Sequence, residues 1–160
     1  MRGREREARS AMDVALRILS RRRVSSGEME ALLLRKGYTG DEVGNCLDRL
    51  KDWGYLDDRS LARDIVSSMV KACPVGKARA MFELERRRFQ KELAREVVEE
   101  VYNGLVEEEL AKVAAERYFG DKKERSLKDC HRLARWLLRR GFEPETVHSI
   151  VSSFGQMCDE

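Results

Sequence analysis

The sequence contains few of the residues that β-sheet proteins depend on. Its 160 residues include two prolines and eleven glycines, and threonine occurs only at Thr39 and Thr146. Sheets use β-branched residues and frequent Gly or Pro turns. Charged residues make up 38% and hydrophobic residues 42% of the chain, a composition that favours helices around a packed core. We therefore expect an all-α fold.

Long hydrophobic runs are also missing. The longest stretch without a charged residue, 146–158, has 13 residues and includes Ser, His and Gln. A membrane-spanning helix needs about 20 mostly apolar residues. The N-terminus is densely charged, and no apolar stretch of signal-peptide type follows it. These absences predict a cytoplasmic protein that does not enter a membrane.

Residues that could carry catalysis are scarce. The two histidines, His131 and His148, have no second ligand at metal spacing. No P-loop, G-x-S-x-G, H-E-x-x-H or dinucleotide-binding pattern occurs. The four cysteines form no C-x-x-C pair and are expected as small buried hydrophobes: Cys46, Cys73, Cys130 and Cys158. We expect no catalytic residue, no metal, no cofactor and no enzymatic activity.

A local pattern recurs three times along the chain. Basic residues precede an aromatic residue at Tyr38, Phe89 and Phe142, with spacings of 51 and 53 residues. The positions five, eight, nine and twelve residues after each aromatic are apolar, and a leucine stands five residues before it. This is one face of a helix, repeated in the same phase. It predicts an elongated, curved tandem array of three three-helix repeats, since no single helix could bury its apolar face alone.

Start and stop signals suggest the limits of these repeats. We expect repeats at 11–56, 57–104 and 105–160 in one continuous domain, after a disordered charged tail at 1–10.

Several residues are expected to begin helices. Ser25 and Thr39 each have a glutamate three residues on, the capping-box pattern, and Asp57 can cap the next helix. In the third repeat, Asp121 with Glu124 is expected to start the second helix, and Pro144 the third.

Positive charge gathers in the middle helix of the later repeats. Residues 71–95 hold eight basic and three acidic residues, and residues 122–140 hold eight and two. Equivalent helices of a stacked array lie on equivalent sides, so these runs could form a cationic stripe that binds a polyanion or an acidic protein surface. The equally weighted alternative is a solvated surface of ion pairs. The candidate interface residues are Lys77, Arg79, Arg86, Arg87, Lys122, Lys123, Arg125, Lys128, Arg132 and Arg135.

Three aromatic residues could serve as interface anchors. They are Trp53, Tyr55 and Trp136. Because large rings bury much apolar area, core packing is the preferred interpretation of each.

The chain resembles the RecX family. The resemblance lies in Ala15–Arg23, Glu28–Gly37 and Leu47–Asp58, and its most specific part is Gly54-Tyr55-Leu56-Asp57-Asp58 followed by Leu61-Ala62. It covers about Ala11 to Gly155. It departs from the family at Arg87-Arg88-Phe89, where a glycine usually precedes the third helix.

This resemblance implies a cytosolic, all-helical regulator that binds the RecA recombinase filament. Such proteins generally inhibit the ATPase, strand-exchange and co-protease activities of RecA, and hence modulate DNA repair, recombination and the SOS response. We expect a monomer with weak non-specific binding to single- or double-stranded DNA. Two alternatives remain: a sequence-specific regulator of helix-turn-helix type, which would need a β-hairpin wing after Gly54, and a purely structural adaptor.

Overall fold

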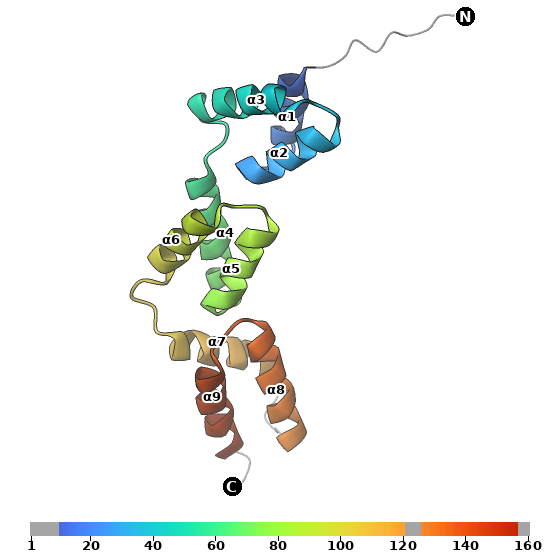
Figure 1. Ribbon diagram of the computed structural model, residues 1–160. Coiled ribbons are helices and arrows are strands. Elements are labelled where there is room, and N and C mark those ends of the chain that lie inside the picture. The colour runs from blue at the N-terminus through green and yellow to red at the C-terminus, as the bar shows by residue number, and fades with distance from the viewer. Residues whose placement is uncertain (1–9, 121–125, 157–160) are drawn as a thin grey trace, which may run out of the picture.

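Every regular element of the protein is a helix in the part of the chain that the structure describes, residues 10–120 and 126–156 of the computed structural model (Figure 1). The helices are α1 (Ala11–Leu19), α2 (Ser26–Arg35), α3 (Gly40–Asp52), α4 (Asp58–Ala72), α5 (Lys77–Arg86), α6 (Lys91–Tyr102), α7 (Glu107–Phe119), α8 (Leu127–Arg139) and α9 (Pro144–Gln156). The predicted all-α class is confirmed. No described helix is long and apolar enough to cross a membrane.

The helices pack in groups of three. Three separate clusters of buried side chains hold α1–α3, α4–α6 and α7–α9 together, centred on residues such as Leu33, Leu84 and Leu137, none of which is exposed. These leucines are the ones found five residues before each aromatic in the sequence pattern. The three bundles follow one another in an elongated row (Figure 1). The tandem repeat is confirmed, and the proposed limits of the repeats stay a prediction.

Most predicted helix starts are present. The Thr39 hydroxyl accepts from the Glu42 N–H at 3.3 Å, and the Glu42 carboxylate accepts from the Thr39 N–H at 2.8 Å. The hydrogen bonds that the Thr39 N–H and hydroxyl donate to the Glu42 carboxylate lower the pKa of Glu42. Asp57 caps α4 by accepting from the Ser60 N–H, and Pro144 is the first residue of α9. Each cap satisfies an N–H that the helix itself leaves unpaired.

Other predicted starts need correction. Ser25 caps α2, but the Glu28 carboxylate bonds to Arg22 at 2.7 Å and so does not complete a capping box. Helix α8 begins after Ser126, whose hydroxyl accepts from the Asp129 N–H. The cap predicted at Asp121 and Glu124 lies outside the described residues.

The disordered tail predicted at 1–10 stays a prediction, and only its last residue, Ser10, is described. Ser10 caps α1 through a full capping box with Asp13. Residues 1–9 lie outside the described part of the chain.

The prediction of buried rings is wrong for Trp53 and Tyr55. They are 52% and 58% exposed and meet edge to face, with ring centroids 6.4 Å apart. Gly54, at φ +73°, turns the chain so that Leu56 seals the corner in place of the rings. Trp136 is half-buried beside Tyr118.

The cysteines follow their prediction in part. Cys46 and Cys130 are buried, whereas Cys73 is only half-buried. Cys158 lies outside the described residues.

The second helices of the repeats lie end to end along one side of the molecule (Figure 1). At the first joint, the Ser25 hydroxyl donates to the Arg87 carbonyl at 2.5 Å. At the second joint, the Gly76 N–H donates to the Arg140 carbonyl at 2.9 Å. Ser25 and Gly76 are the N-caps of α2 and α5, and Arg87 and Arg140 are the C-caps of α5 and α8. The positive end of one helix dipole thus meets the negative end of the next.

Close backbone approach at both joints requires glycine. A Cβ atom added to Gly27 would collide with the carbonyl oxygen of Arg88, and one added to Gly76 would collide with that of Gly141. Further polar contacts fasten the second joint: the Arg140 guanidinium donates to the Pro74 carbonyl at 3.1 Å, and Arg117 donates to the Ala72 carbonyl.

We predict opposite effects for two glycine-to-alanine substitutions. Gly76→Ala should destabilise the fold by about 1–3 kcal/mol, because backbone atoms cannot move away cheaply. Gly44→Ala should stabilise it by about 0.5–1 kcal/mol, since Gly44 is exposed within α3 and an added methyl group meets nothing within 4 Å. Urea denaturation of both variants measures the difference. Equal effects would contradict the close packing of the second joint.

Candidate functional site

The predicted basic residues of the second repeat do not form a free stripe. The Lys77 amine lies 2.7 Å from the Glu99 carboxylate, and the Arg79 guanidinium lies 5.3 Å from the centre of the Phe82 ring. Acidic residues of α6 in this repeat also form ion pairs within the bundle. Arg59 and Arg63 of α4 pair with acids of α6, at 2.9 Å to Glu96 and 2.6 Å to Glu100.

Arg86 and Arg87 share one carboxylate. The Glu83 side chain accepts from Arg86 at 2.8 Å and from Arg87 at 2.7 Å, and Glu83 is only 8% exposed. The hydrogen bond from Arg86, assisted by that from Arg87, lowers the pKa of Glu83 despite its burial. Both guanidinium groups are therefore held in place, while about half of each side chain remains accessible to solvent.

The predicted residues of the third repeat that the structure describes lie along one face of α8. Lys128, Arg132 and Arg135 are exposed, and their spacing places them on the face of α8 opposite to its buried residues. Arg132 lies 4.0 Å from Asp129. Lys122, Lys123 and Arg125 lie outside the described residues.

The structure brings Arg86 and Arg87 together with residues of the first repeat. They line a cavity of about 610 Å³ at the joint between the first two bundles. We call this cavity the arginine groove. Its lining residues are Arg22, Arg23, Glu28, Ala31, Leu32, Arg35, Arg86, Arg87 and Arg88.

The arginine groove keeps a positive charge after its internal ion pairs are counted. Six arginines face three carboxylates: Glu28 in the lining, Glu83, and Asp64, which lies 2.5 Å from Arg23. The net charge is therefore +3. Arg35 and Arg88 are exposed and form no ion pair with any residue that the structure describes. Guanidinium groups bind phosphate and carboxylate in a two-pronged geometry, so the groove suits an anionic ligand.

Sequence reasoning missed the contribution of the first repeat. Arg21-Arg22-Arg23 was visible as a basic run, and Arg35 stands 51 residues before Arg86, the spacing of the repeat. What periodicity cannot supply is the end-to-end contact of α2 with α5. That contact brings both sets of arginines to one joint.

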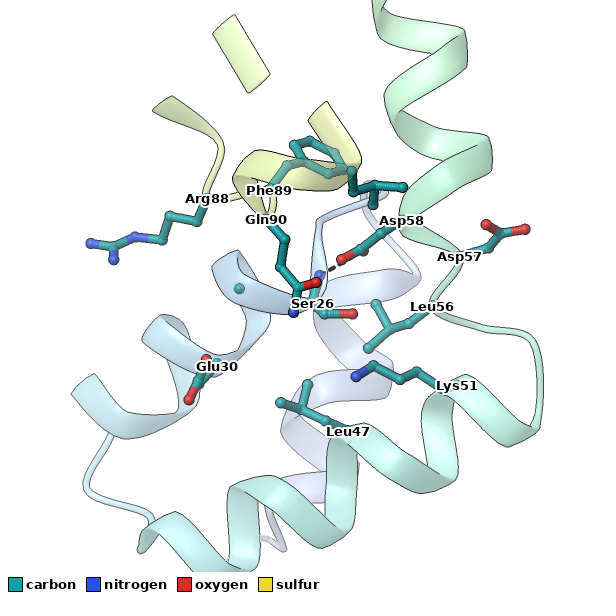
Figure 2. A pocket seen from close by; sticks show the side chains of 12 residues that line it. Ser26, Glu30, Leu47, Lys51, Leu56, Asp57, Asp58, Arg88, Phe89 and Gln90 are labelled. Atoms are coloured by element: carbon teal, nitrogen blue, oxygen red, sulfur yellow. Dashed lines mark hydrogen bonds between the residues drawn. The ribbon is translucent and has the colours of Figure 1, made fainter. Parts of the chain in front are cut away.

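A second cavity of about 640 Å³ opens at the same joint (Figure 2). Its lining mixes apolar residues such as Leu47 and Phe89 with Lys51 and with acids such as Glu30. The Ser26 N–H donates to Asp58 at 2.8 Å across its edge. Because charges of both signs line it, this cavity has no strong preference for an anion.

The described residues offer few side chains suited to metal binding or catalysis. No group of three His, Cys, Asp or Glu residues among them could hold a metal ion. His131 and His148 are both exposed.

Comparison with known proteins identifies the family. The first three-helix domain of RecX matches residues 11–50, and the third three-helix domain of RecX matches residues 106–151. A regulatory protein RecX from Chlorobaculum tepidum is 31% identical over 142 residues, which cover 89% of this chain and 86% of that protein. The chain belongs to the RecX family. It is thus related to proteins that are named as regulators.

Further RecX proteins resemble this family member over most of its length. The regulatory protein RecX of Caldanaerobacter subterraneus is 26% identical, with 91% of this chain and 71% of that protein covered. The crystal structure of RecX from Lactobacillus salivarius has a TM-score of 0.73 at 18% identity and covers 91% of this chain and 95% of that one. This last similarity supports the fold alone.

We predict that Glu83→Gln lowers the urea midpoint at pH 7, because it removes the carboxylate that Arg86 and Arg87 share. The folded-state pKa of Glu83 lies below the usual 4.5. Its contribution is therefore complete above that value and is lost as the pH falls through the lowered one. The difference between wild type and variant should shrink below about pH 4.

Glu85→Gln is the matched control. Glu85 is exposed on the same helix and has no ion pair with a described residue, so the midpoint at pH 7 should hardly change. A gap between wild type and Glu83→Gln that stays constant down to pH 3 would contradict the role assigned to Glu83.

Proposed function

We propose that this RecX-family protein binds the assembled RecA filament and modulates it, in most circumstances by inhibiting ATPase, strand-exchange and co-protease activities. It would thereby act on DNA repair, recombination and the SOS response. It works by binding, as a monomer in the cytoplasm, and catalyses no reaction. Membership of a family named as regulators supports the proposal.

The arginine groove is the observation that supports a mechanism for this binding. A RecA filament contains DNA, whose phosphates form a continuous row of anions. Six arginines converge at one joint of an elongated body. Such an arrangement suits contact with phosphates, which supply most of non-specific binding to DNA. The remaining bundles are then free to contact neighbouring protein subunits of the filament.

Preference for the filament over its free subunits explains how binding becomes regulation. A ligand shifts an equilibrium only through a difference in affinity between two states. A protein that bridges adjacent subunits exists in bound form only where those subunits are assembled. When this protein occupies the groove of the RecA filament, it hinders the motions of RecA subunits, or the addition of new subunits, on which the activities of RecA depend.

The helix-turn-helix alternative lacks its wing. After Gly54 the chain enters α4 at Asp58, and no strand occurs in residues 10–120 or 126–156. A sequence preference in the absence of RecA would revive that alternative.

The proposal predicts a specific loss on neutralising the arginine groove. Replacing Arg22, Arg35 and Arg86 by Gln should weaken inhibition of the DNA-stimulated RecA ATPase and reduce its salt dependence, with helicity unchanged. The measurement is a titration of each variant into that assay. Inhibition far below one-to-one would indicate action at filament ends, and saturation near stoichiometry would indicate coating.

The control removes the same number of charges elsewhere. Lys91, Arg95 and Lys112 are exposed on α6 and α7, outside the arginine groove. Their replacement by Gln should leave inhibition close to wild type. If both triple variants lost inhibition equally, the groove would act only through its share of the net charge. If neither variant lost inhibition, the groove would not be the site.

A further inference from the structure

Arg88 has a backbone conformation that L-amino acids rarely adopt. Its φ is +59°, and no other non-glycine residue in the described chain has a positive φ. The first and third repeats have Gly37 and Gly141 at the equivalent position, with φ of +93° and +79°. A left-handed conformation is unfavourable for a residue with a Cβ atom and persists only where the surroundings enforce it.

The surroundings of Arg88 do enforce this conformation. Its N–H donates to the Glu85 carbonyl at 2.9 Å, and the Phe89 N–H donates to the Leu84 carbonyl at 3.1 Å, which together end α5. The Arg88 carbonyl rests against Gly27 of the neighbouring bundle. Glycine would satisfy every one of these backbone contacts without strain. The reason for arginine must therefore lie in its side chain.

The Arg88 side chain contributes little to the fold. It is exposed and has no ion pair with any described residue. Figure 2 shows it extending away from the other labelled side chains. It lines both cavities of the joint and thus stands on the ridge between them. An unpaired guanidinium in this position is open to an external ligand.

We infer that Arg88 contacts a phosphate group of DNA bound along the arginine groove. The inference rests on the proposed function, since it assigns a ligand to the same groove. Ala31 and Leu32 are the only apolar residues of the lining, and no aromatic residue belongs to it. Protein interfaces commonly add buried aromatic anchors to their arginines, whereas a phosphate chain is bound chiefly by cations. The composition of the groove therefore favours nucleic acid over an acidic protein surface.

Arg88→Gly separates this inference from a structural role, because the two predict opposite signs. The substitution removes the backbone strain and should raise the thermal midpoint by about 2–4 °C. It should also weaken binding to a random 30-base-pair duplex. The slope of log K against log salt should fall by about 0.9, the value for one lost phosphate contact. If Arg88 served only to pack the fold, Arg88→Gly would lower the thermal midpoint and leave the slope of log K against log salt unchanged.

Two further variants complete the test. Arg88→Lys keeps the charge and the strain, so its slope and its midpoint should both stay near wild type. Arg95→Gln removes an exposed cation outside both cavities and should leave the slope unchanged. Both measurements use the full chain.

The outcomes distinguish the inference from the proposed function. If Arg88→Gly keeps the full slope while the triple groove variant loses it, Arg88 is no phosphate ligand and the groove stands. If the triple variant also keeps its slope on DNA yet loses inhibition of RecA, the groove binds an acidic protein surface and the inference falls. A lower thermal midpoint for Arg88→Gly would overturn the argument from strain.

Discussion

The end-to-end contact of the second helices organises the rest of this molecule. One hydrogen bond at each joint, from Ser25 to Arg87 and from Gly76 to Arg140, links the N-terminus of a helix to the C-terminus of the next repeat's equivalent helix. The first bond satisfies the terminal carbonyl of α5 with a side-chain donor, and the second pairs the N–H at the start of α5 with the terminal carbonyl of α8. Because cations are favoured near helix C-termini, the same geometry that stacks the bundles also collects arginines at the joints. Architecture and charge thus have a common origin.

The two joints use equivalent arginines differently. At the second joint, Arg140 donates to the Pro74 carbonyl and stacks on Trp136, so its guanidinium is committed to the fold. At the first joint, its equivalent Arg87 is turned to Glu83 and lines the arginine groove. The following position is Gly141 in one repeat and Arg88 in the other. The change from Gly141 to Arg88 and the different partners of Arg140 and Arg87 make the first joint a cationic site, although a C-cap carbonyl accepts a hydrogen bond at both joints.

The repeat and its helices could be predicted because they depend on local signals. The apolar positions after Tyr38, Phe89 and Phe142 place Val43, Ala94 and Val147 in the three cores. The groove could not be predicted, because it depends on which helix ends meet. The predicted burial of Trp53 and Tyr55 was wrong for a related reason. The direction of the chain after Gly54 decides which side chain is buried there, and the smaller Leu56 fills the corner. Lys77 was assigned to the interface from charge alone, which stays a prediction, and the periodicity could not show that Glu99 of α6 lies within reach of its amine.

The net charge of the arginine groove limits what it can do by itself. Of its six arginines, four have a carboxylate partner, and the sum with these partners is only +3. Few released counterions give a modest affinity for DNA that falls as salt rises. Contact with phosphates therefore cannot by itself hold such a protein on a filament at physiological ionic strength. Under the proposed function, selectivity must come from protein subunits touched by the other bundles, with the groove fixing where along the DNA the elongated body lies.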